Sequence, residues 1–248
     1  MANQSVEVLE NPEALARRAA GWITDLAAAS RDRFAICLSG GSTPRRLYQL
    51  LGESPYRDRL PWQRVHWFWG DERFVPWDDP DSNYGMVHAA LLGRAPARAA
   101  NIHGIATDGT PREAAARYER VLKTYYGSES LDEAQPLFDI DILGLGPDGH
   151  TASLIPGTSV LEERHRWVAE VIGGRPEPRI TLTYPVLESS RHTAFLVAGT
   201  DKREALSRVL AGDQALPAAR IRPLGDLAWF VDEAARPQPD PQTMIPQA

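Results

Sequence analysis

The stretch Asp141-Ile-Leu-Gly-Leu-Gly-Pro-Asp-Gly-His-Thr-Ala-Ser153 decides the fold, because an apolar run ends in glycines and is followed by an aspartate and a histidine. The apolar residues from 138 to 145 predict a buried parallel strand, residues 146–149 predict a turn, and Thr151 is expected to begin a helix. In open α/β sheets, ligands bind at the carboxyl ends of strands. Asp148 and His150 are therefore candidate catalytic residues.

A helix N-terminus disfavours an imidazolium ion, so this position is expected to keep His150 neutral and able to accept a proton from water. The backbone N–H groups between Gly146 and Gly149 are expected to stabilise an oxyanion. A capping or packing histidine beside an ordinary glycine turn explains this segment equally well. Other segments of the sequence are needed to distinguish these two interpretations.

Composition is that of an ordinary globular protein, with 248 residues and a formal net charge of −6. This charge argues against a nucleic-acid partner, although a few local cations could hold a small anion. The single cysteine, Cys37, lies in an apolar run, which indicates a buried thiol in a reducing compartment. Neither a signal peptide nor a membrane-spanning run is seen, so we expect a cytoplasmic protein, monomeric or weakly homo-oligomeric.

Apolar runs alternate with helical patterns along the chain, which predicts an α/β fold with a doubly wound, mostly parallel sheet and flanking helices. Strands are expected at residues 34–38, 65–69, 138–145, 167–172, 179–183, 193–197 and 227–231, and helices at residues 12–29, 44–51, 82–92, 111–126 and 202–210. We expect one domain over residues 1–235 and a Pro-rich, poorly ordered tail over residues 236–248.

A second motif, Ser39-Gly-Gly-Ser-Thr-Pro44, follows the strand expected at residues 34–38. Pro44 is expected at the first helical position, so that free N–H groups, the helix dipole and hydroxyls would face an anion. Ser39, Gly40, Gly41 and Ser42 are therefore candidate phosphate-binding residues, although a simple capped turn is the alternative. The motif is neither a dinucleotide fingerprint nor a Walker loop.

Further charged residues follow other expected strands. In Gly70-Asp-Glu-Arg73, Arg73 could bind phosphate and Asp71 could orient a histidine or act as a base, although a charge-rich loop is more often simply solvated. Arg179 begins one strand and Lys202 follows another, so both could reach the same rim. Histidines and the cysteine show no metal-ligand spacing, and no metal is expected.

Three of these motifs together resemble the 6-phosphogluconolactonase family, in matching order across most of the chain. The distinctive stretches are Ser-Gly-Gly-Ser-Thr-Pro from residue 39, Gly-Asp-Glu-Arg with the later Ser82-Asn83, and Gly-Leu-Gly-Pro-Asp-Gly-His-Thr-Ala-Ser-Leu from residue 144. The resemblance implies the fold shared with glucosamine-6-phosphate deaminases. It also implies hydrolysis of 6-phospho-D-glucono-1,5-lactone, a small sugar-phosphate substrate, without a cofactor.

By the same resemblance, His150 handles protons, with Asp148 or Asp71 orienting its ring, while Arg73, Arg179, Lys202 and residues 39–42 surround the phosphate. Two other functions occur on similar folds. A glucosamine-6-phosphate deaminase would carry a glutamate shortly after the histidine, where this chain has Leu-Ile-Pro at residues 154–156. A noncatalytic sugar-phosphate sensor would usually add a DNA-binding helix pair, whereas the sheet is expected to begin at residue 34, after a short leader.

Overall fold

The computed structural model describes residues 3–238, which form an α/β fold around a seven-stranded sheet of order β1-β10-β9-β6-β2-β3-β5. Every pairing in this sheet is parallel, and helices lie on both faces, which confirms the predicted fold class. The strands are β1 (Gln4–Leu9), β2 (Phe34–Leu38), β3 (Val65–Trp69), β5 (Ile102–His103), β6 (Phe138–Gly144), β9 (Ser190–Val197) and β10 (Asp226–Asp232).

A second, three-stranded antiparallel sheet has the order β4-β8-β7. It consists of β4 (Asp71–Arg73), β7 (Val168–Val171) and β8 (Arg179–Leu182). The sequence predicted β7 and β8 as strands but not their separate sheet, because apolar content does not reveal which strands pair. The backbone N–H of Leu182 donates to Gly70 O at 2.8 Å, which joins this sheet to the end of β3.

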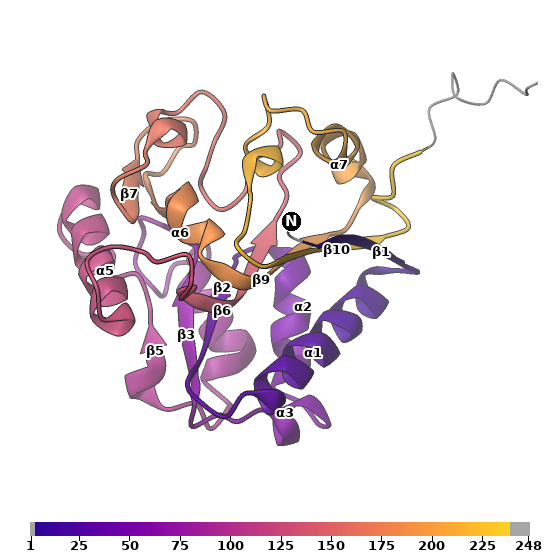
Figure 1. Ribbon diagram of the computed structural model, residues 1–248, viewed down its shortest axis with the longest axis horizontal. Coiled ribbons are helices and arrows are strands. Elements are labelled where there is room, and N and C mark those ends of the chain that lie inside the picture. Colours follow the sequence, from indigo (N-terminus) through magenta and orange to yellow (C-terminus); the bar gives the residue numbers. More distant parts are fainter. Residues whose placement is uncertain (1–2, 239–248) are drawn as a thin grey trace, which may run out of the picture.

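Helices cover both faces of the large sheet, with α1 and α2 on one side and α6 and α7 on the other (Figure 1). The helix α5 packs against β7 and β8 and also contacts β3 of the large sheet, where Tyr118 and Tyr125 meet Trp69 and Phe68. The helices are α1 (Pro12–Ala29), α2 (Ser42–Leu51), α3 (Tyr56–Arg59), α4 (Asn83–Val87), α5 (Pro111–Tyr126), α6 (Tyr184–Glu188) and α7 (Arg203–Leu210). A π turn, η1 (His88–Leu92), extends α4, and 3-10 turns are η2 (Ala99–Asn101), η3 (Ser159–Glu162), η4 (Thr200–Lys202) and η5 (Pro217–Arg220).

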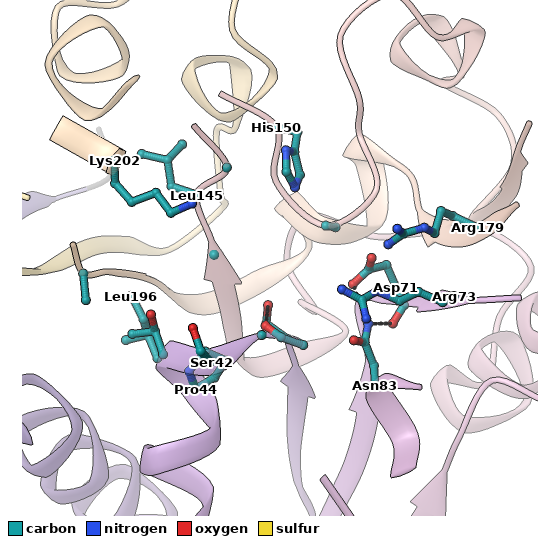
Figure 2. Close-up of a pocket in the computed structure, with 18 residues that line it drawn as sticks. Ser42, Pro44, Asp71, Arg73, Asn83, Leu145, His150, Arg179, Leu196 and Lys202 are labelled. Atoms are coloured by element: carbon teal, nitrogen blue, oxygen red, sulfur yellow. Dashed lines mark hydrogen bonds between the residues drawn. The ribbon is translucent and has the colours of Figure 1, made fainter. Parts of the chain in front are cut away.

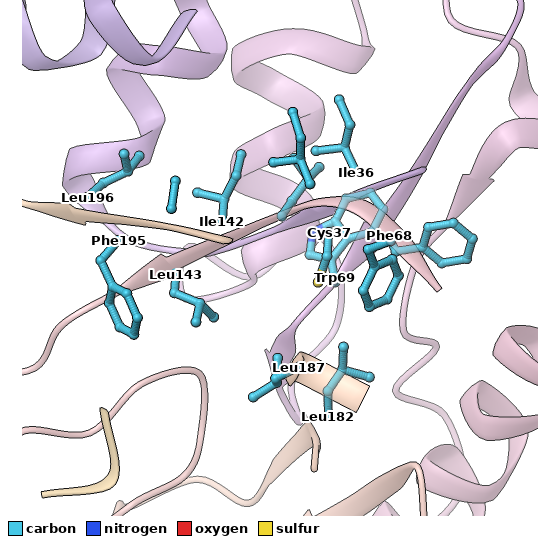
Figure 3. Close-up of a cluster of buried hydrophobic side chains, with 14 of the residues drawn as sticks. Ile36, Cys37, Phe68, Trp69, Ile142, Leu143, Leu182, Leu187, Phe195 and Leu196 are labelled. Atoms are coloured by element: carbon cyan, nitrogen blue, oxygen red, sulfur yellow. The ribbon is translucent and has the colours of Figure 1, made fainter. Parts of the chain in front are cut away.

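The core lies on both faces of the central strands β2 and β6. Ile36 and Ile142 point toward the layer of α1 and α2, whereas Leu143 and Phe195 point toward β8 and α6 (Figure 3). Such strands are buried on both sides and read as continuous apolar runs, which is why the sequence reveals them clearly.

The expectation that the sheet begins at residue 34 is wrong. Strand β1 pairs in parallel with β10 at the edge of the sheet, where Val6 is 46% exposed and Glu7 forms an ion pair with Arg18. An edge strand with one half-solvated face carries too few apolar residues to be recognised. Most of the tail expected at residues 236–248 lies outside the described residues, and over residues 3–238 no helix is both long and apolar enough to cross a membrane.

Asp141 lies in the middle of the central strand β6 and is fully buried. Neither carboxyl oxygen has a hydrogen-bond partner of normal geometry, and the neighbouring residue in the β2 ladder is Cys37. Burial raises the pKa of Asp141 to about 7, although the Cys37 thiol acts in the opposite direction. The folded protein therefore retains a proton that the unfolded chain releases.

Replacing Asp141 with Asn should change how stability depends on pH. In the parent protein, the contribution of Asp141 to the free energy of unfolding falls as pH rises from the ordinary pKa of 3.8 through about 7, and this loss is complete above that range. The melting temperature of the variant, minus that of the parent, should therefore increase from pH 5 to pH 7 and then stay constant. Thermal unfolding followed by circular dichroism measures this difference, and a difference independent of pH would contradict the prediction.

Candidate active site

A polar cleft of about 200 Å³ lies where the strands β9, β6, β2 and β3 end. These four strands are neighbours in a parallel sheet, so the segments that follow them meet at one edge. The chain leaves β2 and β6 toward opposite sides of the sheet (Figure 1), and the segments that follow both strands line the cleft. All the candidate site residues except Asp148 line this cleft (Figure 2).

His150 is presented by a tight turn after β6. The N–H of Gly149 donates to Gly146 O at 2.9 Å, and the N–H of Gly146 donates to His150 O at 2.9 Å. A Cβ atom on Gly146 would lie 2.0 Å from His150 Nδ1, so only glycine leaves room for the imidazole, which points into the cleft (Figure 2). Both N–H groups are engaged within the turn, so the expectation that backbone N–H groups of residues 146–149 stabilise an oxyanion stays a prediction, which rests on the N–H of Asp148.

The helix expected to begin at Thr151 is absent. Thr151 forms a β-bridge with Leu154, and Ala152, at the floor of the cleft, has a left-handed φ of 47°. Residues other than glycine rarely adopt such a conformation, so the turn is held by its surroundings. One of these contacts is a 2.6 Å hydrogen bond from Ser153 Oγ to Asp71 Oδ2. No helix N-terminus follows His150, so the electrostatic effect expected from a helix dipole is absent at this turn.

Asp148 orients the imidazole through a short hydrogen bond between its Oδ1 and His150 Nδ1. Partial burial of the Asp148 carboxyl opposes ionisation, yet hydrogen bonds from Arg175 and His150 hold its pKa well below the usual range. Since an ionised carboxylate can only accept, the proton of the neutral ring lies on Nδ1 and Nε2 has a free lone pair. This ring nitrogen is the base that the cleft offers.

Asp71 forms no hydrogen bond with His150 among the described residues. It instead connects three segments of the chain through hydrogen bonds. Its Oδ2 accepts from Ser153, and its Oδ1 accepts from Asn83 Nδ2 at 3.2 Å. The same Asn83 nitrogen donates to the backbone oxygen of Asp71 at 2.9 Å. Asn83 also lies directly against Gly40, where a Cβ atom would come within 1.9 Å of its Oδ1. The sequence did not single out Asn83, although it belongs to the quoted Ser82-Asn83 pair.

The expectation that the Asp-Glu-Arg triplet is simply solvated is wrong, because Glu72 is completely buried. Its carboxylate accepts the N–H groups of Arg73, Asn83 and Tyr84 at 2.7–2.8 Å, and the Ser82 hydroxyl at 3.2 Å. Burial raises the pKa of Glu72 to about 7 against the effect of these hydrogen bonds. Glu72 thereby fixes the start of α4 beside β4.

Two arginines form a like-charged pair across the β4–β8 ladder, where Arg73 is opposite Arg179. Arg73 Nη1 donates to Asp81 O at 2.5 Å, and burial together with the Arg73 charge lowers the pKa of Arg179. Lys202, paired with Asp201 at 2.9 Å, lies on the other side of His150 (Figure 2). The predicted cations thus share one cleft but approach it from two sides.

The turn at residues 39–42 faces the cleft at the N-terminus of α2. Gly41 is the N-cap with a φ of 106°, which requires glycine, and Pro44 stands at the third helical position, not at the first as expected. Tyr48 stabilises the turn with two hydrogen bonds. Its hydroxyl accepts from the N–H of Ser39 at 3.0 Å and donates to Ser39 O at 2.8 Å. The N–H of Ser39 is therefore not free to bind a ligand.

Nothing in residues 3–238 brings together three or more His, Cys, Asp or Glu side chains in a way that could hold a metal ion. The arrangement offers instead an imidazole, an ionised carboxylate that orients it, and cations with a helix N-terminus around a small cleft. These features define an α/β protein suited to proton-transfer chemistry on a small anionic molecule.

Residues 10–229 match the family described as glucosamine-6-phosphate isomerases/6-phosphogluconolactonase, and the chain belongs to this family. A 6-phosphogluconolactonase of Nostoc sp. is 42% identical over 240 residues, which cover 94% of this chain and 97% of that protein. The crystal structure of 6-phosphogluconolactonase from Thermotoga maritima is 30% identical with a TM-score of 0.80, over 93% of this chain and 100% of that one.

A monomeric glucosamine-6-phosphate deaminase is also similar in structure, with a TM-score of 0.77 over 93% of this chain and 98% of that chain. Its sequence identity is 22%, so this likeness concerns the fold alone. It confirms the expectation that the fold is shared with such deaminases.

Replacing Gly40 with Ala should disturb the segments that Asn83 joins. The new methyl group would displace the Asn83 amide and break its hydrogen bonds to Asp71. We expect a loss of about 1–3 kcal/mol in the free energy of unfolding, as is typical of overpacking. Urea denaturation measures this loss in the free energy of unfolding. The matched control is Gly21→Ala in α1, where a Cβ atom meets nothing within 4 Å and stability should be equal or higher. Equal stability of the two variants would contradict the prediction.

Proposed function

We propose that the protein hydrolyses 6-phospho-D-glucono-1,5-lactone to 6-phospho-D-gluconate, the second step of the oxidative pentose phosphate pathway. The observation that carries this proposal is a histidine whose Nε2 has no hydrogen-bond partner among residues 3–238 and faces a cationic cleft. The near full-length similarity to a lactonase supports the choice of substrate.

In the proposed reaction, water enters the cleft beside His150 Nε2 and attacks the C1 carbonyl carbon of the lactone. The imidazole takes one proton from this water, while Asp148 holds Nδ1 and stabilises the imidazolium that forms. The tetrahedral intermediate then collapses, the bond between C1 and the ring oxygen breaks, and His150 returns the proton to that oxygen. The product is an open-chain acid, and the base is regenerated.

The phosphate of the substrate is proposed to bind at Lys202 and the N-terminus of α2, where Gly41 and Ser42 line the cleft. A dianion is favoured at a helix N-terminus and beside an ammonium group. Arg73 and Arg179 approach from the other side of His150 and complete the predicted set of cations. Their mutual repulsion is relieved when an anion enters the cleft between them and Lys202.

Asp71 is proposed to act mainly by positioning, because Asn83 and Ser153 already hold both of its carboxylate oxygens. We also propose that residues 1–235 act as one domain, since this hydrogen-bond network joins the small sheet to the turn after β6. A cytoplasmic location and a monomeric or weakly associating state remain predictions, and the buried Cys37 thiol is compatible with a reducing compartment.

The deaminase alternative is disfavoured by the residues after His150. Leu154 and Ile155, which stand where a deaminase-like chain would carry Asn and Glu, are both buried apolar side chains. Ring opening and proton movement between C1 and C2 require additional acid–base groups. A noncatalytic sensor is disfavoured because a Nε2 lone pair directed into the cleft is not needed for binding alone.

The purified protein should accelerate hydrolysis of freshly prepared lactone over its spontaneous rate. His150→Ala should lose about 10²–10⁴-fold in kcat, the usual contribution of general acid–base catalysis, with little change in binding of 6-phosphogluconate. Proton release at constant pH measures the rate, and calorimetry measures the binding. Glucosamine 6-phosphate serves as the control substrate and should give no ammonia. A parent rate equal to background, or unchanged kcat in the variant, would overturn the proposal.

Substitution of Lys202 or Arg73 by Met should raise KM for the lactone at least tenfold, because each removes a charge-assisted hydrogen bond to the substrate, worth about 1.5–3 kcal/mol. Comparing the phosphorylated lactone with glucono-1,5-lactone isolates phosphate recognition, since slow turnover of the latter should be insensitive to Lys202. Arg45→Met, on the exposed side of α2, is the matched control. If Lys202→Met affects both lactones equally, Lys202 does not bind the phosphate.

A further inference from the structure

Arg175 contacts the catalytic pair, although no motif had pointed to it. It lies in the loop between β7 and β8, directly after Gly173 and Gly174, both of which have positive φ. Its Nη2 donates to Asp148 Oδ2 at 2.7 Å and lies 3.1 Å from His150 Nδ1. Asp148 therefore has His150 on one carboxylate oxygen and a guanidinium on the other.

We propose that Arg175 is a positioning residue that keeps His150 in its neutral, proton-accepting form. A lone carboxylate beside Nδ1 would favour the imidazolium, which cannot accept a proton from water. The guanidinium opposes this in two ways. It compensates the charge of Asp148, and its own charge lies near the ring nitrogen, where it disfavours a second positive charge.

The short contact to Nδ1 does not reverse the tautomer. If Arg175 donated to a bare Nδ1, the Asp148 carboxylate would face a lone pair at hydrogen-bond distance, which is repulsive. The proton on Nδ1 thus belongs to the hydrogen bond with Asp148, and Arg175 acts through its charge. This replaces the helix N-terminus that the sequence had suggested as the cause of neutrality.

Other charged groups around the cleft face His150 from elsewhere. Positive charge comes from two sides, from Arg73 and Arg179 on one and from Lys202 on the other. Asp71 adds negative charge, which has the opposite effect on the ring. Within residues 3–238, none of these four side chains forms a hydrogen bond or ion pair with the imidazole or with Asp148. Arg175 is the cation that contacts Asp148 directly, so its removal should have the largest local effect.

The test is the pH dependence of kcat/KM in Arg175→Gln, Arg175→Lys and the parent. Loss of the charge in Arg175→Gln should move the acidic limb of the profile to higher pH by about one unit. At pH values below this limb, kcat/KM should therefore fall about tenfold. Arg175→Lys keeps the charge and should stay close to the parent. KM should change little, because Arg175 is not proposed to contact the phosphate. The matched control is Arg191→Gln, which breaks an Arg–Asp pair at the opposite end of the sheet.

The kinetic readout rests on the proposed lactonase function, so a second measurement avoids the substrate. With ¹³C-labelled histidine, NMR should show the His150 resonance, assigned by its loss in His150→Gln, titrating at higher pH in Arg175→Gln than in the parent. An inactive parent with this shift would refute the lactonase function and leave the role of Arg175 intact. An unmoved or lowered titration, or equal shifts in the Gln and Lys variants, would overturn the role of Arg175.

Discussion

The hydrogen bonds between Asp71, Asn83 and Ser153 are the constraint on which the cleft depends. They join the segment after β3 to the start of α4, 12 residues further along the chain, and to the turn after β6, 82 residues away from Asp71. The close approach of Gly40 to Asn83 brings in the turn after β2. Because these contacts are buried, each unpaired partner would be costly, and the segments hold one another in place.

This network explains the position of the proposed catalytic pair, Asp148 and His150. The turn that carries His150 has no helix to support it, and Ala152 adopts a left-handed conformation that an isolated chain would avoid. The hydrogen bond from Ser153 to Asp71 anchors the residues that follow, while Gly146 gives the imidazole its space. A rigid support of this kind is what proton transfer in a fixed geometry requires.

The sequence predicted the strands buried on both faces, β2, β3 and β6, because their residues are uniformly apolar. It missed β4, since Asp71 and Glu72 look solvated when only sequence neighbours are considered. The partners of Glu72 are backbone N–H groups mostly ten or more residues away, and no local sequence pattern predicts these contacts. In the cleft, residues at strand ends were predictable from the topology of parallel sheets, whereas the position of Asn83 at the start of α4 and that of Arg175 in a loop depend on tertiary contacts.

The electrostatics of the cleft follow from the same arrangement. Binding an anionic substrate calls for positive charge, and positive charge around an imidazole also keeps it neutral, so the two requirements agree. An ionised Asp148 acts against the second requirement, since it is needed to fix the tautomer but favours the imidazolium. The ion pair between Asp148 and Arg175 resolves this conflict, because it preserves the hydrogen bond to Nδ1 while reducing the charge that the ring experiences. In the proposed arrangement, the carboxylate thereby orients the imidazole while Arg175 offsets the preference for the imidazolium that the carboxylate would otherwise create.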